Sequence, residues 1–257
     1  MKIALLGYGR MGRAIEKVAL ERGHEIVIRK DIEPLKIDLN IADAAIDFSH
    51  PTAAFDNIKS CIDSGVAVVS GTTGWLDKFE EIETYCKEKN GSFIYASNFS
   101  IGVNLFFNLN KYLAQMMKNI KGYEVAMEEI HHVHKLDAPS GTAISLANDV
   151  LAHSDKNNWT ISARKKDELY IGVKREDEVP GTHSVTYTSA IDAIEIKHTA
   201  FNREGFALGA VVAAEWLQDK KGIFNMQDVL SLSFRKINFW KKVTSPDVIL
   251  QIKKINN

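Results

Sequence analysis

Three histidines and a lysine fall within five consecutive positions of this 257-residue chain: His131, His132, His134 and Lys135. Ser140, Gly141 and Thr142 follow and open a stretch with helical periodicity. Histidine titrates near neutrality and can deliver a proton to a carbon centre, while a lysine supplies a fixed charge for a carboxylate. Backbone N–H groups and hydroxyls at a helix start favour an anion. The segment therefore predicts a site that binds a small anionic substrate and protonates it.

Two other interpretations fit parts of this segment, a zinc site and a purely structural loop. Adjacent His131 and His132 point to opposite sides of an extended chain, and no cysteine or spaced carboxylate completes a familiar ligand set. The two cysteines, Cys61 and Cys86, lie in separate predicted helices without metal-ligand spacing. We therefore predict reduced core cysteines and no metal site. Arg203 is a second cation that can hold a carboxylate bidentately, although most arginines simply lie on the surface.

A glycine-rich turn lies between the first predicted strand (2–6) and the first predicted helix (13–22). It reads Gly7-Tyr8-Gly9-Arg10-Met11-Gly12. Such a turn lets the backbone approach a pyrophosphate closely, with the phosphate charge facing the helix N-terminus. The strand–turn–helix context separates it from a chance glycine pattern. We assign all six residues to a dinucleotide cofactor.

The ribose of such a cofactor is read near the end of the second strand, where Arg29, Lys30 and Asp31 follow one another. Basic residues there favour a 2′-phosphate, whereas Asp31 suits a 2′-hydroxyl. The alternative interpretation is that all three residues are solvated charges in a loop. The cofactor is thus predicted to be NADPH or NADH, with NADPH favoured. The loop 71–74, Gly-Thr-Thr-Gly, follows the fourth strand, where it is either a plain turn or a contact of the nicotinamide ribose. We assign Gly71, Thr72 and Thr73 to the cofactor site.

The order of elements predicts the fold class. Strands at 2–6, 25–29, 44–48, 66–70 and 92–96 alternate with amphipathic stretches, the pattern of a parallel α/β sheet. Helix 103–118, a strand from about 123 to 130, helix 141–151 and strands 182–189 and 193–199 then suggest an open mixed sheet with one covering helix. An apolar helix at 206–216 precedes short helices and an irregular tail.

The bulk composition excludes some partners. Lys and Arg total 32 against 33 Asp and Glu, so the net charge of -1 gives no general attraction to nucleic acid or membranes. No apolar run approaches the roughly 20 residues that span a bilayer. The N-terminal MKIALLGYG is typical of a buried strand rather than a signal peptide. We expect a soluble, cytoplasmic protein.

The histidine segment also closely resembles the signature of the 4-hydroxy-tetrahydrodipicolinate reductase (dihydrodipicolinate reductase) family. The matching run is Glu-Glu-Ile-His-His-Val-His-Lys-Leu-Asp-Ala-Pro-Ser-Gly-Thr-Ala. Further similar segments are Gly-Arg-Met-Gly at 9–12, Asp-Phe-Ser-His-Pro at 47–51, loop 71–74, Ser-Asn-Phe-Ser-Ile-Gly-Val-Asn at 97–104, Gly-Thr-His at 181–183, and 222–230. The resemblance extends from residue 1 to about 231.

This resemblance implies a reduction by NAD(P)H of a cyclic imine with two carboxylates, in the diaminopimelate route to lysine. By position, His131 matches the proton donor of the family and Lys135 its partner in substrate binding and catalysis. His132, Gly141 and Thr142 match substrate-binding positions, with Ser140 beside them, and His134 is then the most dispensable of the three histidines. Within the similar segment 97–104 we assign Ser97, Asn98 and Phe99 to the cofactor.

The family fold is a Rossmann-like α/β domain with an inserted α+β mixed-sheet domain for substrate binding and oligomerisation. We accordingly divide the chain into residues 1–102 plus 204–257, which bind the dinucleotide, and residues 103–203. The family commonly forms a homotetramer, and we expect one here. The expected ligand besides the cofactor is a small dicarboxylate substrate. Its usual turn has one more residue between the first glycines, and it often has an acidic residue where Arg29 and Lys30 stand, so the cofactor preference stays open.

Two alternative functions compete with this one. Another Rossmann oxidoreductase acting on a dicarboxylate, of the aspartate-dehydrogenase kind, would consume cofactor only with an open-chain acid. A redox sensor that binds NAD(P)H without turnover would leave the histidine-lysine segment unexplained.

Overall fold

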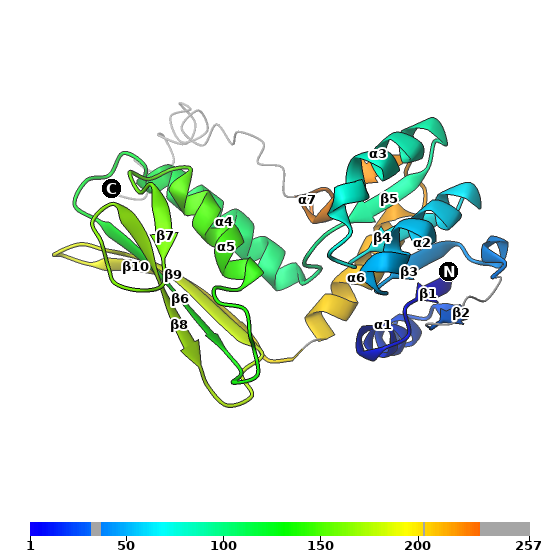
Figure 1. Ribbon diagram of the computed structural model, residues 1–257, viewed down its shortest axis with the longest axis horizontal. Coiled ribbons are helices and arrows are strands. Elements are labelled where there is room, and N and C mark those ends of the chain that lie inside the picture. Colours follow the sequence, from blue (N-terminus) through cyan, green and yellow to red (C-terminus); the bar gives the residue numbers. More distant parts are fainter. Residues whose placement is uncertain (32–36, 203, 232–257) are drawn as a thin grey trace, which may run out of the picture.

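The computed structural model describes residues 1–31, 37–202 and 204–231, which form two lobes (Figure 1). One lobe, at the right of Figure 1, is built on a parallel sheet, and the other, at the left, on a mixed sheet. Helix α4 (Ile101–Met117) leads into the mixed-sheet lobe, and helix α6 (Glu204–Leu217) leads back. This arrangement confirms the predicted fold class, a Rossmann-like α/β fold with an inserted α+β part.

The parallel sheet has six strands in the order β11-β5-β4-β3-β1-β2. Their bounds are Lys2–Leu6 (β1), Glu25–Lys30 (β2), Ala44–Asp47 (β3), Ala67–Ser70 (β4), Ser92–Tyr95 (β5) and Gly222–Phe224 (β11). Because β2 and β3 lie on opposite sides of β1, the strand order reverses between β1 and β3. Ligands of open α/β sheets bind outside the carboxyl ends of the strands at such a reversal, here beyond Leu6 and Asp47.

Helices bury both faces of this sheet, because its strands are apolar on both sides. The helices are α1 (Arg10–Glu21), α2 (Pro51–Asp63), α3 (Phe79–Glu88) and the returning α6. Alternate residues of β1 enter different cores: Ile3 and Leu5 pack with α1 and α6, whereas Ala4 and Leu6 pack with α2 and α3. The carboxyl edge of the sheet is therefore held rigidly from both sides.

The mixed sheet has five strands in the order β10-β9-β6-β8-β7. Their bounds are Glu124–His131 (β6), Asn158–Thr160 (β7), Glu168–Arg175 (β8), Gly181–Thr188 (β9) and Ala193–Ala200 (β10). β6 pairs in parallel with β8 and antiparallel with β9. The central strand β6 thus carries its last residue, His131, to the end of the sheet between two neighbours.

Two helices, α4 and α5 (Gly141–Leu151), cover one face of this sheet, so the prediction of a single covering helix was wrong. α4 shares a core with α5 through Phe106 and Leu113, and the side-chain amide of Asn110 donates to the Leu146 carbonyl (3.1 Å). The short strand β11 was also missed, within a region expected to be helical and irregular. Helix α7 (Met226–Val229) is the last helix in the described part of the chain.

Candidate active site

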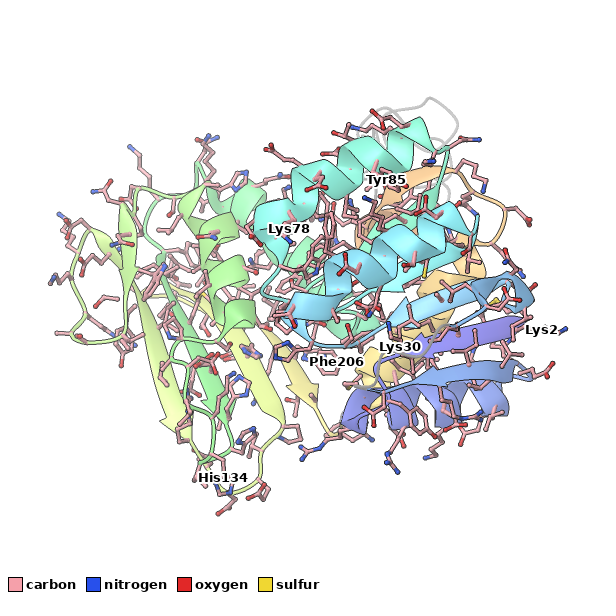
Figure 2. All side chains as sticks on the ribbon, turned by 45° about the vertical axis from the view of Figure 1, so that its right-hand side comes forward. Lys2, Lys30, Lys78, Tyr85, His134 and Phe206 are labelled. Carbon is pink, nitrogen blue, oxygen red and sulfur yellow. The ribbon has the colours of Figure 1, made fainter. Side chains whose placement is uncertain are left out.

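A cleft of about 700 Å³ lies between the lobes and is lined from both sides. From the parallel-sheet lobe come Met11, Thr73, Ser97 and Asn98; from the mixed-sheet lobe come His131, His132, Lys135, Ser140, Gly141 and Thr142. Figure 2 shows Phe206, which also lines the cleft, at the junction of the lobes. Residues predicted for the cofactor and residues predicted for the substrate therefore surround one cavity.

His131 ends strand β6 and is only 8% exposed. Burial lowers the pKa of His131, because a charged imidazole loses its hydration there, while the nearby Glu129 carboxylate opposes this effect. The backbone of Gly181 packs directly against the ring, since a Cβ at that position would lie 2.9 Å from His131 Cε1. The imidazole is thus held in a defined place at the cleft wall.

The two other histidines of the segment differ in their surroundings. His132 lines the cleft, and its Nδ1 is buried without a hydrogen-bond partner in the described part of the chain. A buried polar atom of this kind is costly unless a ligand satisfies it, which suits a substrate contact. His134 is exposed, lies 3.0 Å from a Glu178 carboxylate oxygen, and projects at the outer end of its lobe in Figure 2.

Lys135 supplies the cationic side of the cleft. Its Nζ donates to both carboxylate oxygens of Asp137 (2.7 and 2.8 Å), and this contact holds the pKa of Asp137 below its usual range. The Asp137 side chain is 61% exposed, so this ion pair is open to solvent. Next to it, Ser140 caps helix α5 by accepting the Ala143 N–H (3.2 Å), and a Cβ on Gly141 would meet nothing within 4 Å. This open helix start is suited to an anion.

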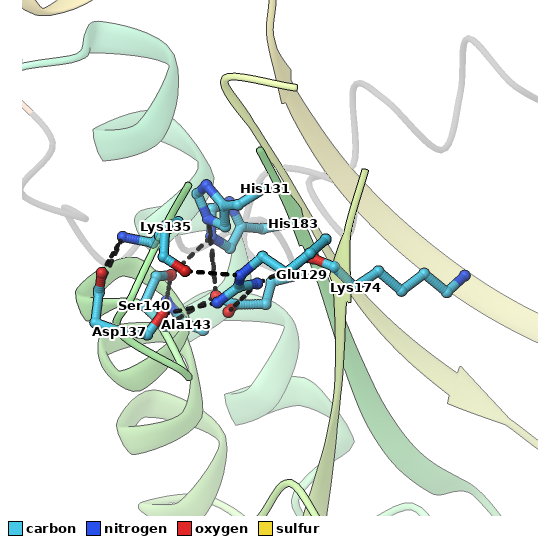
Figure 3. Close-up of polar contacts among 9 residues, drawn as sticks. Glu129, His131, Lys135, Asp137, Ser140, Ala143, Lys174 and His183 are labelled. Atoms are coloured by element: carbon cyan, nitrogen blue, oxygen red, sulfur yellow. Dashed lines mark hydrogen bonds and ion pairs between the residues drawn. The ribbon is translucent and has the colours of Figure 1, made fainter. Parts of the chain in front are cut away.

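Three residues that were not predicted from the sequence join this site: Glu129, Arg175 and His183. Figure 3 labels Glu129 and His183. Glu129 precedes His131 by two positions on the same strand, so both side chains point to the same face. That spacing was the available signal for Glu129. Arg175 and His183 come from β8 and β9. The Gly-Thr-His segment at 181–183 was noted for its family resemblance, but its place in the sequence does not put His183 beside His131.

One potential ligand atom from each of Glu129, His131 and His183 lies within 4.8 Å of the other two. A metal ion at this point would compete with the Ser140 N–H, which already donates to Glu129 (2.9 Å), and would lie beside the Arg175 guanidinium. We therefore interpret the cluster as a network for holding a proton.

The glycine turn is built as a dinucleotide turn. Gly7 has φ +97°, and a Cβ there would lie 2.1 Å from the Phe48 carbonyl oxygen; one on Gly12 would lie 2.2 Å from the Gly7 oxygen. Gly9 has nothing within 4 Å of its would-be Cβ, which leaves room for a pyrophosphate. A second cleft of about 720 Å³ begins here, lined by Gly7, Tyr8, Gly9, Lys30 and Asp31. These residues fit the dinucleotide that the fold implies.

The remaining predicted cofactor residues stand further back. Arg29 donates from Nε to Glu16 (2.8 Å) and does not line this second cleft, whereas Lys30 lines it and donates to Asn57 (2.7 Å). Arg10 is exposed at the start of α1. Three others pack behind the carboxyl edge of the parallel sheet. Gly71 packs on the Phe48 ring, Thr72 donates to Asp47 (2.7 Å), and Phe99 is buried in the core. Arg203, the predicted second cation, lies outside the described residues.

A glycine turn at the reversal point of a parallel sheet, facing histidines and a lysine across a cleft, defines a nicotinamide-dependent oxidoreductase of the Rossmann class. Comparison with known families specifies this class further. The family models described as dihydrodipicolinate reductase, N-terminus and C-terminus, match residues 1–99 and 102–230. The chain belongs to the dihydrodipicolinate reductase family.

Individual relatives agree with this assignment. The 4-hydroxy-tetrahydrodipicolinate reductase of Christiangramia forsetii is 56% identical, over 91% of this chain and 100% of that protein. The enzyme of the same name from Neisseria gonorrhoeae is 32% identical, over 91% of this chain and 99% of its own length. The dipicolinate-bound dihydrodipicolinate reductase of Paenisporosarcina sp. TG-14 shares the fold, with a TM-score of 0.73 at 21% identity over 89% of this chain and 98% of that one.

Proposed function

We propose that this chain reduces 4-hydroxy-tetrahydrodipicolinate to tetrahydrodipicolinate with NAD(P)H, in the diaminopimelate route to lysine. Its family and its 56% identical relative support this reaction. The single observation that carries the proposal is the shared cleft: the predicted cofactor residues Met11, Thr73 and Asn98 face His131 and Lys135. A hydride donor and a proton donor can therefore reach one bound molecule from opposite lobes.

The protein residues act by binding, orientation and proton transfer. Lys135 binds one substrate carboxylate in exchange for Asp137, and the start of α5 at Ser140, Gly141 and Thr142 binds the other. A bound reduced nicotinamide supplies the hydride. His131 donates the proton to the neighbouring ring carbon, so one hydride and one proton are added, water leaves the hydroxylated substrate, and oxidised cofactor remains.

For the cofactor we propose that Lys30 governs the recognition of a 2′-phosphate, with both NADPH and NADH accepted. Lys30 and Asp31 line the same cleft as the glycine turn, and they suit a 2′-phosphate and a 2′-hydroxyl respectively. Arg29 contributes less than its sequence position suggests, because Glu16 already binds it.

We also propose a homotetramer, with residues 103–203 as the unit for substrate binding and association and residues 1–102 plus 204–257 as the nucleotide-binding unit. Helices cover one face of the mixed sheet, and the other face carries the groove lined by Ala126, Tyr170 and Thr186, which supports contact with another copy. Light scattering during gel filtration tests this stoichiometry.

Among the described helices, none has the length and apolarity needed to cross a membrane.

The reaction is tested by initial rates of NADPH and NADH oxidation on freshly generated substrate. We expect cofactor oxidation only when the cyclic substrate is present, with tetrahydrodipicolinate as the product. Oxidation with open-chain dicarboxylic acids but not with the cyclic substrate would contradict the proposal. Binding of NADPH without any turnover would also contradict it.

A further inference from the structure

Glu129 is a fully buried carboxylate that no step of the reaction above uses. Its Oε2 lies 3.8 Å from His131 Nε2 and 3.7 Å from His183 Nε2, and it accepts the Ser140 N–H (2.9 Å). Its Oε1 lies 3.4 Å from the Arg175 guanidinium. Figure 3 shows this carboxylate beneath the two imidazoles. Removal of such a group from water is costly, so its position beside the proton donor calls for a role.

The two imidazoles share a hydrogen bond. His131 Nε2 and His183 Nε2 are 3.3 Å apart, and such a contact needs one nitrogen with a proton and one without. Burial is the largest influence on His183 and lowers its pKa to about 4, so His183 is neutral at physiological pH. Its Nε2 can then accept from the Nε2–H of His131, while the Ser140 hydroxyl lies 3.1 Å from the same nitrogen.

We propose that Glu129 and His183 are positioning residues for His131: Glu129 favours the protonated imidazole through its negative charge, and His183 orients the ring by accepting a hydrogen bond from its Nε2–H. This inference rests on the proposed role of His131 as proton donor. It assigns Nε2 of His131 as the hydrogen-bonding nitrogen, His183 as the acceptor and Glu129 as the opposite charge. The reaction itself specifies none of these.

Other charged groups around His131 act against Glu129. Lys135 from the loop and Arg175 from β8 both disfavour a positive charge on His131, as burial does. Asp137 is paired with Lys135, and His198 faces His183 from β10. Glu129, on the same strand as His131, favours the protonated form most strongly, and a hydrogen bond to the Pro180 backbone adds to it.

The test compares Glu129→Gln with Glu128→Gln. The two substitutions remove one charge each from neighbouring positions, but Glu128 is on the other face of β6 and pairs with the partly exposed Lys174 (2.7 Å). Glutamine at 129 can still accept the Ser140 N–H. The titration of His131 is followed by NMR of its ring, assigned with His131→Gln, and the pH dependence of kcat/KM is measured in parallel.

We expect Glu129→Gln to move the His131 titration and the alkaline limit of kcat/KM to lower pH, by about one unit for the loss of a nearby opposite charge. At pH 8 the value of kcat/KM should then fall about tenfold, with the affinity for the cofactor unchanged. Glu128→Gln should leave both titrations in place. Identical His131 titrations in the two variants would overturn the inference. Because the NMR titration needs no turnover, this result is distinct from a failure of the proposed reaction.

His183 provides the second variant if Glu129→Gln does not fold. His183→Phe keeps a ring of similar size but removes the acceptor, whereas His183→Gln places an amide oxygen that can accept in its stead. We expect the phenylalanine variant to lose about tenfold or more in kcat with little change in KM, and the glutamine variant to recover part of this loss. Equal, wild-type kcat values and pH profiles in both His183 variants would overturn the role of His183.

Discussion

The contact between Gly181 and His131 offers a sharp test of how precisely the proton donor is held. An alanine at position 181 would place its Cβ 2.9 Å from Cε1 and 3.3 Å from Nδ1 of His131. Carbon atoms pack best at about 3.5–4.0 Å, so the imidazole and the strand that carries residue 181 must move apart by roughly 0.6–1 Å. A misplacement of about 1 Å can reduce a catalytic rate about 100-fold. We therefore expect Gly181→Ala to lower kcat by about 10- to 100-fold.

The matched control is Gly172→Ala in the neighbouring strand β8. There the nearest atom to an added Cβ is the Met127 carbonyl oxygen at 3.6 Å, an ordinary contact, and the position does not line the cleft between the lobes. Both variants are assayed for kcat and KM at a pH where His131 is protonated, and their unfolding temperatures are compared with the wild type. A folded Gly181→Ala enzyme with kcat within twofold of the control would refute a rigidly held donor.

Three further predictions concern substrate, cofactor and stability. Lys135→Ala should lower kcat/KM about 10- to 100-fold, the loss of one charge-assisted contact, and an unchanged kcat/KM would exclude Lys135 from the substrate site. Lys30→Ala should raise the KM for NADPH about tenfold and the KM for NADH much less. Arg29→Ala should change both KM values little, because the Arg29 guanidinium of the wild type is already bound to Glu16. Steady-state rates with each cofactor measure these values. Gly209→Ala should lower the free energy of unfolding by about 3 kcal/mol, because its Cβ would lie 1.7 Å from the Phe99 carbonyl oxygen. Denaturant unfolding checks this beside Gly205→Ala, whose Cβ would lie at an ordinary 3.4 Å from Ser100 Oγ.

The sequence predicted those helices whose capping residues and apolar spacing lie within the element itself. Helix α5 begins and ends at the predicted residues, because Ser140 caps it and apolar residues recur with helical spacing. Helix α4 begins at Ile101 rather than at the predicted residue 103, because Ser100 supplies the cap. Strand β11 has only three residues and owes its extended form to pairing with β5, which lies far away in sequence. Such a strand leaves no alternation to detect.

The site divides in the same way. His131, Lys135 and Ser140 occur in one short segment, and their residue types alone indicated an anionic substrate and a proton. The polar groups around His131 come from three strands, since His183 lies 52 positions away on β9 and Arg175 on β8. Arg29 shows another long-range pairing: its position in sequence indicated phosphate binding, and the structure adds a hydrogen bond to Glu16 of the preceding helix that the sequence did not indicate. Pairings of this kind depend on the packed sheet.

The most direct test of the central claim is the rate of NADPH oxidation by His131→Gln with freshly generated 4-hydroxy-tetrahydrodipicolinate. General acid catalysis contributes about 10²- to 10⁴-fold, so we predict that kcat falls at least about 100-fold. The affinity for NADPH, measured by its fluorescence, should stay at the wild-type value because the glycine turn is untouched. Turnover of His131→Gln close to that of the wild type would contradict the assignment of His131 as the proton donor.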